Sequence, residues 1–161
     1  LQFHRFGLIS EVQKTLAETG LPAELLELEM TESILVNEAE EAIDMIRSLR
    51  EMHVSVAIDD FGTGFSSLSY LRDLPISKIK LDRAFIQNVA NSRSDAAIVD
   101  GIITMAHHMG LTVVAEGIET HEQQQNMISR ECDLLQGFLF SRPFPLSELV
   151  GLPKRLPAYD F

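Results

Sequence analysis

The sequence predicts a parallel α/β fold. Short stretches rich in β-branched and other apolar residues alternate along the chain with longer stretches in which apolar residues recur at helical spacing. Five stretches of the first kind occur, and no linker, internal repeat or low-complexity segment interrupts the series. Strands that alternate with helices are typical of a parallel sheet with right-handed crossover connections, so we expect one α/β domain.

The first part of the chain is predicted to hold two helices, each followed by a strand. Apolar residues at helical spacing favour a helix over residues 8–16, and Gly20 is typical of the residue that ends one. Residues 25–30 then form a strand. The second helix is expected over residues 37–52, beginning at an asparagine cap, and β-branched residues alternate through the strand at residues 54–59.

The remaining elements are mostly shorter and are separated by polar residues, proline or glycine. In chain order we expect a short helix at 67–73, a strand at 77–81, a helix at 95–109, a strand at 112–115, a helix at 120–130, a strand at 134–137 and a short helix at 147–150. The helix at 120–130 has a clear start signal, because Thr120 and Gln123 have the spacing of a capping box.

Charged or amide side chains lie where each strand is expected to end. They are Glu29, Asp59 with Asp60, Lys80, Glu116 and Gln136. The carboxyl ends of the strands in a β/α barrel form one rim, which is where the active sites of such barrels lie. We therefore expect these side chains to converge, although they are far apart in the sequence.

The residue types at this rim favour a hard divalent cation. Mg²⁺ and Mn²⁺ prefer carboxylate oxygens. The sequence has no group of cysteines or paired histidines that would bind zinc. Two ions that share Asp59 and Asp60, roughly 3.5–4 Å apart, would activate a water and stabilise the leaving oxygen of a phosphodiester. Lys80 would have a lowered pKa or act as a donor, and so orient or deprotonate that water. The predicted reaction is metal-assisted phosphodiester hydrolysis.

Charge and composition narrow the class of partner and the location. The 161 residues include 13 basic and 24 acidic side chains, a formal net charge of −11 that argues against a nucleic-acid polymer or an anionic membrane as the main partner. The single cysteine, Cys132, has no partner for an internal disulfide, and no apolar run is long enough to cross a bilayer, so a cytoplasmic setting is expected. Because the chain starts at Leu1 without a signal-like segment, we expect a piece of a longer protein.

Five motifs together resemble, in order and spacing, those of the EAL-domain family. They are EMTES at 29–33, DDFGTGFSS at 59–67, KIKLD at 78–82, VAEGIET at 114–120 and QGF at 136–138. The resemblance covers essentially the whole chain. It implies a TIM-like (β/α) barrel that hydrolyses cyclic di-GMP to linear pGpG with Mg²⁺ or Mn²⁺.

The resemblance also implies roles for individual residues. By motif, Glu29, Asp59, Asp60 and Glu116 resemble the metal ligands, Lys80 the general base, and Glu119 a second acid on the rim. Gln136 and Asp82 are similar to substrate-side residues. Glu32 resembles the glutamate that anchors the glycine-rich loop Phe61, Gly62, Thr63 and Gly64, which in this family links the site to the dimer interface.

The sequence also departs from the family pattern. The Glu-Ala-Leu tripeptide does not occur, and the metal-binding asparagine of the next strand is expected before Leu1. A full barrel of this kind has about 250 residues. We therefore expect residues 1–161 to be a partial EAL domain, an incomplete barrel of about five βα units, which by itself binds metal poorly and is inactive.

Each of these residues also has a simpler explanation. Asp59 and Asp60 could cap a turn, and Lys80 with Glu116 could be a structural ion pair. Glu32 and Glu119 could be solvated acids near helix starts, and Gln136 alone indicates little. The agreement among several strand ends, rather than any one residue, favours the site.

Two readings of function remain open from the sequence. The parent domain is either a cyclic di-GMP phosphodiesterase or a non-catalytic receptor that binds the nucleotide, and the family resemblance implies further sensor or GGDEF-type domains, with any membrane anchor, outside this chain. An open partial barrel exposes strand edges, so we expect a homodimer or other self-association.

Overall fold

The structure, a computed structural model, describes residues 5–32, 39–62 and 68–149. These residues form a five-stranded parallel sheet in the order β1-β2-β3-β4-β5. The strands are β1 (Glu27–Thr31), β2 (Ser55–Phe61), β3 (Lys78–Leu81), β4 (Thr112–Ala115) and β5 (Leu134–Leu135). Within the described part, β1 and β5 do not pair with each other, so the sheet is unclosed.

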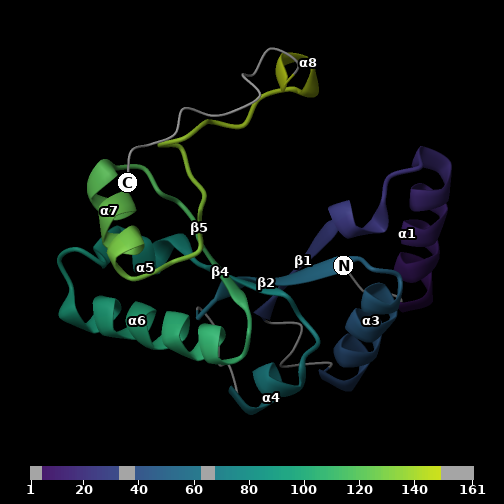
Figure 1. Ribbon diagram of the computed structural model, residues 1–161, viewed down its shortest axis with the longest axis horizontal. Coiled ribbons are helices and arrows are strands. Elements are labelled where there is room, and N and C mark those ends of the chain that lie inside the picture. The colour runs from purple at the N-terminus through teal and green to yellow at the C-terminus, as the bar shows by residue number, and fades with distance from the viewer. Residues whose placement is uncertain (1–4, 33–38, 63–67, 150–161) are drawn as a thin grey trace.

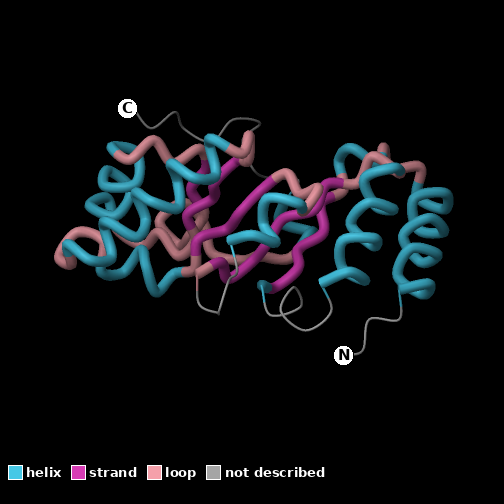
Figure 2. Tube along the Cα trace, turned by 90° about the horizontal axis from the view of Figure 1, so that it is seen from below, coloured by secondary structure: helices cyan, strands magenta, loops and turns pink. Residues whose placement is uncertain are grey.

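Helices alternate with the strands along the chain (Figure 1). They are α1 (Arg5–Thr19), α3 (Ala39–Glu51), α4 (Leu68–Asp73), α5 (Arg83–Asn88), α6 (Arg93–His108), α7 (His121–Ser129) and α8 (Leu146–Leu149), with a 3₁₀ turn η1 (Ala23–Leu25) before β1. Figure 2 shows the strands between α1 and α3 at one end and α5, α6 and α7 at the other. The predicted class, an incomplete TIM-like barrel of about five βα units, is confirmed.

The two faces of the sheet differ in chemistry because successive strand residues point to opposite faces. One face supplies Val56, Ile58, Ile79, Leu81 and Val113 to the hydrophobic core under the helices. The alternate positions carry polar residues, including Glu27, Glu29, Lys78 and Lys80, which line a cavity of about 820 Å³. The apolar face therefore stabilises the sheet, and the other face is free to carry a site.

Local start and stop signals position several of the helices. Thr120 and Gln123 form the predicted capping box: Thr120 Oγ1 accepts from the Gln123 N–H at 3.2 Å, and Gln123 Oε1 accepts from the Thr120 N–H at 3.0 Å. Gly20 and Gly110 follow α1 and α6 with φ of 68° and 73°, the left-handed conformation that glycine adopts readily. Asn37, the predicted cap of α3, lies outside the described residues.

Some element boundaries differ from the predicted ones. The strand expected to start at Leu25 starts at Glu27, because Leu25 belongs to η1. The helix expected from residue 95 begins at Arg93, where Ser92 Oγ accepts from the Asp95 N–H. The helix α5 was not predicted; its cap is Asp82, whose Oδ1 accepts from the Ala84 N–H at 2.8 Å.

None of the helices in the described ranges combines the length and the apolar character that crossing a membrane requires.

Candidate functional site

Lys80 lies at the centre of a carboxylate cluster at the carboxyl ends of the strands. Its side chain is 6% exposed, and its Nζ lies 2.6 Å from Glu29 Oε1, 2.7 Å from Glu116 Oε1 and 3.2 Å from Asp59 Oδ1. These partners come from β1, β2 and the residue after β4. The structure thus brings together four of the predicted rim residues.

The charge state of Lys80 follows from this surrounding. Burial lowers the pKa of Lys80, but its hydrogen bonds to Glu116 and Glu29 raise the pKa by more, so the net direction is upward. The sequence left open a lowered pKa or a role as donor. With these partners Lys80 is a protonated donor to three carboxylates.

A β-bulge explains how Asp59 and Asp60, which are adjacent, contribute to one cluster. Between the register pairs Ile58 with Ile79 and Phe61 with Leu81, β2 advances one residue more than β3. A regular strand would point the two aspartates to opposite faces, but a bulge re-aims a side chain. Asp60 has a φ of 54°, a left-handed conformation that aspartate tolerates better than most residues.

The acids of the cluster suit a divalent cation. Asp59, Asp60 and Glu116 each offer a carboxylate oxygen within 4.8 Å of the others. The pKa of Asp60 is raised by burial and then by the charges of Asp59 and Asp82. Burial also raises the pKa of Glu116, although Lys80 opposes this rise. Crowded carboxylates of this kind are the oxygen ligands that Mg²⁺ and Mn²⁺ prefer, so the residues present fit such an ion.

Glu32 lies beside the cluster and contacts the loop that follows β2. The residue is 3% exposed, and its Oε2 accepts a hydrogen bond from the Gly62 N–H at 2.8 Å. Gly62 has a φ of 93°, and a Cβ there would lie 2.7 Å from the Phe85 ring, so both conformation and space require glycine. Phe61 is buried, while Thr63 and Gly64, also predicted for this loop, lie outside the described residues.

Three other predicted site residues, Glu119, Asp82 and Gln136, are not among the ion-pair partners of Lys80 given above. Glu119 Oε1 lies 3.0 Å from the Arg83 guanidinium. Asp82 caps α5 and faces Asp60. Gln136 is exposed and lines the cavity, and its backbone N–H donates to Ala115 O at 2.9 Å.

Sequence reasoning missed three charged residues near this rim. Arg83 pairs with Glu119, and its side chain packs on Gly117, where a Cβ would lie 2.6 Å from Arg83 Cγ. Glu27 and Lys78 form an ion pair with a Nζ to Oε1 distance of 2.8 Å. Glu27 lies two residues before the predicted site residue Glu29, and Lys78 lies two residues before Lys80. Strand alternation would have placed them on the same face.

Comparison with known proteins agrees with this geometry. The EAL domain model matches residues 1–143. The chain is 46% identical over 157 residues to the cyclic di-GMP phosphodiesterase NbdA of Pseudomonas aeruginosa, covering 98% of this chain and 20% of NbdA. It is 43% identical over 151 residues to the bifunctional diguanylate cyclase/cyclic di-GMP phosphodiesterase MucR of the same organism, covering 94% of this chain and 22% of MucR.

Solved structures show the same likeness in three dimensions. The MucR phosphodiesterase in complex with cyclic di-GMP superposes with a TM-score of 0.88 at 43% identity, covering 92% of this chain and 60% of that chain. The manganese and cyclic di-GMP complex of Klebsiella pneumoniae BlrP1 gives a TM-score of 0.82 at 34% identity, covering 88% of this chain and 36% of that chain. The chain spans only about a fifth of the curated relatives named here. On the family match and the shared fold, the chain belongs to the EAL domain family.

Proposed function

We propose that the domain to which this chain contributes hydrolyses cyclic di-GMP to linear pGpG in a reaction that depends on Mg²⁺ or Mn²⁺. The observation that carries the proposal is the contact of one buried ammonium group, that of Lys80, with carboxylates from Glu29, Asp59 and Glu116. The activities named for NbdA and MucR support it. Because the chain covers 60% of the MucR phosphodiesterase chain, hydrolysis is proposed for the whole domain and not for residues 1–161 alone.

The metal ligands proposed from this chain are Asp59, Asp60, Glu116 and Glu29. The first three form the oxygen cluster, and Glu29 reaches it through Lys80. A divalent ion bound there supplies an activated water and stabilises the leaving oxygen of the phosphodiester.

The remaining residues bind, orient or transfer protons. Lys80 directs its N–H groups at the place where the carboxylates converge, so it orients the attacking water or accepts a proton from it. The proton-accepting role requires a lowered pKa, which a further positive charge on the same carboxylates would produce. Glu119, held by Arg83, acts as a second acid on the rim, while Gln136 and Asp82 contact the nucleotide.

The loop after β2 is proposed to regulate the site. Phe61, the last residue of β2, and then Gly62, Thr63 and Gly64 follow directly after the two aspartates, and Glu32 anchors the loop through the Gly62 N–H. Any movement of the loop is therefore transmitted to Asp59 and Asp60.

Product analysis tests the proposed activity. The natural full-length protein, with Mn²⁺ or Mg²⁺, is expected to convert cyclic di-GMP to pGpG, and Lys80→Gln is expected to abolish turnover. The matched control is Lys14→Gln, which removes a lysine of an exposed helical pair on α1 and leaves turnover unchanged. Nucleotide binding without any product would instead establish the alternative, a non-catalytic receptor.

Residues 1–161 alone are proposed to bind metal weakly and to lack turnover. Measurable hydrolysis by this chain would contradict that statement.

We propose a homodimer or other self-association for this chain, in a cytoplasmic protein with further signalling domains. Leu134, in the terminal strand β5, and Phe138, shortly after it, are 46% and 48% exposed, which suits a covered surface. MucR is named as bifunctional, which supports a GGDEF-type or sensor domain in the parent. The free thiol of Cys132 suits a reducing compartment, and the net charge of −11 disfavours nucleic-acid polymers. A strictly monomeric elution at high concentration would contradict self-association.

A further inference from the structure

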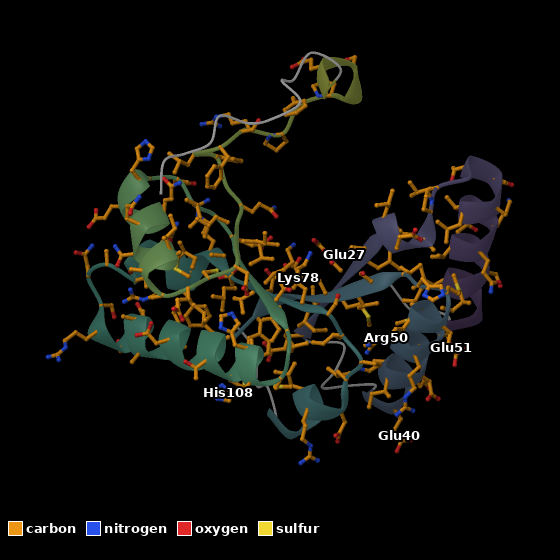
Figure 3. The ribbon with its side chains drawn as sticks, in the orientation of Figure 1. Glu27, Glu40, Arg50, Glu51, Lys78 and His108 are labelled. Atoms are coloured by element: carbon orange, nitrogen blue, oxygen red, sulfur yellow. The ribbon has the colours of Figure 1, made fainter. Side chains whose placement is uncertain are left out.

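Two lysine and glutamate pairs lie one below the other on the polar face of the sheet. The upper pair is Lys80 with Glu29, at 2.6 Å, and the lower pair is Lys78 with Glu27, at 2.8 Å. Both pairs span from β3 to β1 across β2, and all four side chains line the same cavity. Figure 3 shows Glu27 and Lys78 near each other over the sheet, away from the labelled residues on α3 and α6.

Both pairs have the same two-residue offset from the backbone register, as the tilt of strands in a β/α barrel produces. Glu29 is in register with Ala57, and Ala57 is in register with Lys78, so Lys78 is level with Glu29 across β2. The buried methyl group of Ala57 leaves room for long side chains to pass above it. Lys78 therefore lies near the level of both glutamates; it contacts Glu27, and Glu29 contacts Lys80.

Stability alone is a poor reason for the lower pair. Its side chains are 22% and 30% exposed, so the pair is partly buried. Apolar residues of similar volume often stabilise a protein as well as a desolvated ion pair does. The interior layers of β/α barrels are indeed dominated by branched apolar residues. A charged layer directly below Lys80 therefore suggests a role in the site.

We propose that Glu27 and Lys78 are positioning residues that keep each other out of the reaction centre. This inference rests on the proposed function, because it concerns the arrangement of Lys80 and Glu29. Without Glu27, Lys78 is free to compete with Lys80 for Glu29. Without Lys78, Glu27 is free to compete with Glu29 for Lys80. Removing both charges removes both competitors.

The first readout is independent of metal. In the 161-residue chain, the ¹H–¹⁵N signal of the Lys80 ammonium group reports its burial and its carboxylate partners through slow hydrogen exchange. Glu27→Gln and Lys78→Gln are each expected to accelerate this exchange until the signal is lost, and the double variant is expected to restore the signal. An effect of charge at a distance predicts the reverse pattern, in which the two single variants shift the exchange in opposite directions. That pattern, or unchanged single variants, would overturn the proposal.

The second readout is the Mn²⁺ affinity of the same variants, measured from paramagnetic broadening. Each single variant is expected to weaken Mn²⁺ binding by about 10-fold, the lower end of the range for groups that orient metal ligands, and the double variant to recover most of it. Charge alone predicts that Lys78→Gln tightens binding, which would count against positioning.

A matched control uses the exposed pair of Lys14 and Glu18 on α1, where the corresponding glutamine variants leave both readouts unchanged. If the unmodified chain shows no Mn²⁺ site at all, the metal set of the proposed function fails, while the ammonium signal still decides the positioning proposal.

Discussion

The buried carboxylate of Glu32 accepts a hydrogen bond from the backbone N–H of Gly62, 2.8 Å away and thirty positions later in the chain. This bond connects the end of β1 to the loop that follows the two aspartates of β2. The loop and the carboxylate cluster are therefore mechanically linked through one side chain.

Glu32→Ala is expected to lower the free energy of unfolding by about 1–3 kcal/mol, because it leaves the Gly62 N–H without its acceptor. Urea denaturation measures the loss, and hydrogen exchange at the Gly62 amide should become faster in the same variant. Glu32→Gln retains an acceptor oxygen and should recover part of the stability. If the alanine and glutamine variants exchange at Gly62 as slowly as the unmodified chain, the bond does not anchor the loop.

Asp60→Asn is expected to stabilise the metal-free chain while it weakens Mn²⁺ binding. The pKa of Asp60 is raised, so its charged form is disfavoured in the folded state. This loss of folding stability is present above the folded pKa of Asp60 and disappears as the pH falls through this value. Asparagine tolerates the left-handed conformation and removes the charge. Thermal melts at pH 7 and at pH 3 should therefore show a gain at pH 7 only, whereas a loss of stability at pH 7 would contradict this reasoning.

Gly117→Ala is expected to destabilise the fold by about 1–3 kcal/mol, since Gly117 has a φ of 71° and the added Cβ meets the Arg83 side chain. Unfolding by urea measures the effect. The matched control is Gly101→Ala within α6, where a Cβ meets no atom within 4 Å; it should stabilise the chain by about 0.5–1 kcal/mol. Equal effects of the two substitutions would show that the turn after Glu116 is not strained.

Acid is expected to weaken the contacts that Asp133, just before β5, makes with α6 and β4. Asp133 Oδ2 accepts from the Val113 N–H at 2.8 Å and contacts His107 Nε2 at 3.0 Å. Burial raises the pKa of Asp133, but these two contacts lower it by more, so the net direction is downward. The stability it contributes is therefore present above the ordinary aspartate pKa of about 3.9 and is lost as the pH falls through the lower folded value. Asp133→Asn should flatten the stability profile in this acidic range, and an unchanged profile would refute the link.

Local chemistry made much of the fold predictable from the sequence. The capping box at Thr120 and Gln123 involves only neighbouring residues, so a short pattern identifies it, and the structure confirms it. The alternation of β-branched residues in β2 was similarly informative. The helix α5 was missed because Asp82 was interpreted only as a site residue, although an aspartate before six helical residues is also an N-cap.

The geometry of the site was predictable only in outline. Strand-end positions indicated which carboxylates would converge, because parallel strands end at one edge. The bulge that turns both Asp59 and Asp60 toward Glu116 depends on pairing between β2 and β3, which no local pattern reveals. The raised pKa of Lys80 likewise depends on partners from other strands. The pairing of Glu119 with Arg83 depends on packing across the rim.

The central claim is that the carboxylates around Lys80 form a divalent-metal centre. A Mn²⁺ titration of the isotopically labelled chain, followed by amide NMR, tests it most directly. The amides of Asp59, Asp60 and Glu116 are expected to broaden at the lowest Mn²⁺ concentrations, before those of Ser55 and Thr112 at the opposite ends of β2 and β4. First broadening at the exposed acids of α3, such as Glu40 and Glu51, with Asp59 and Asp60 unaffected, would contradict it.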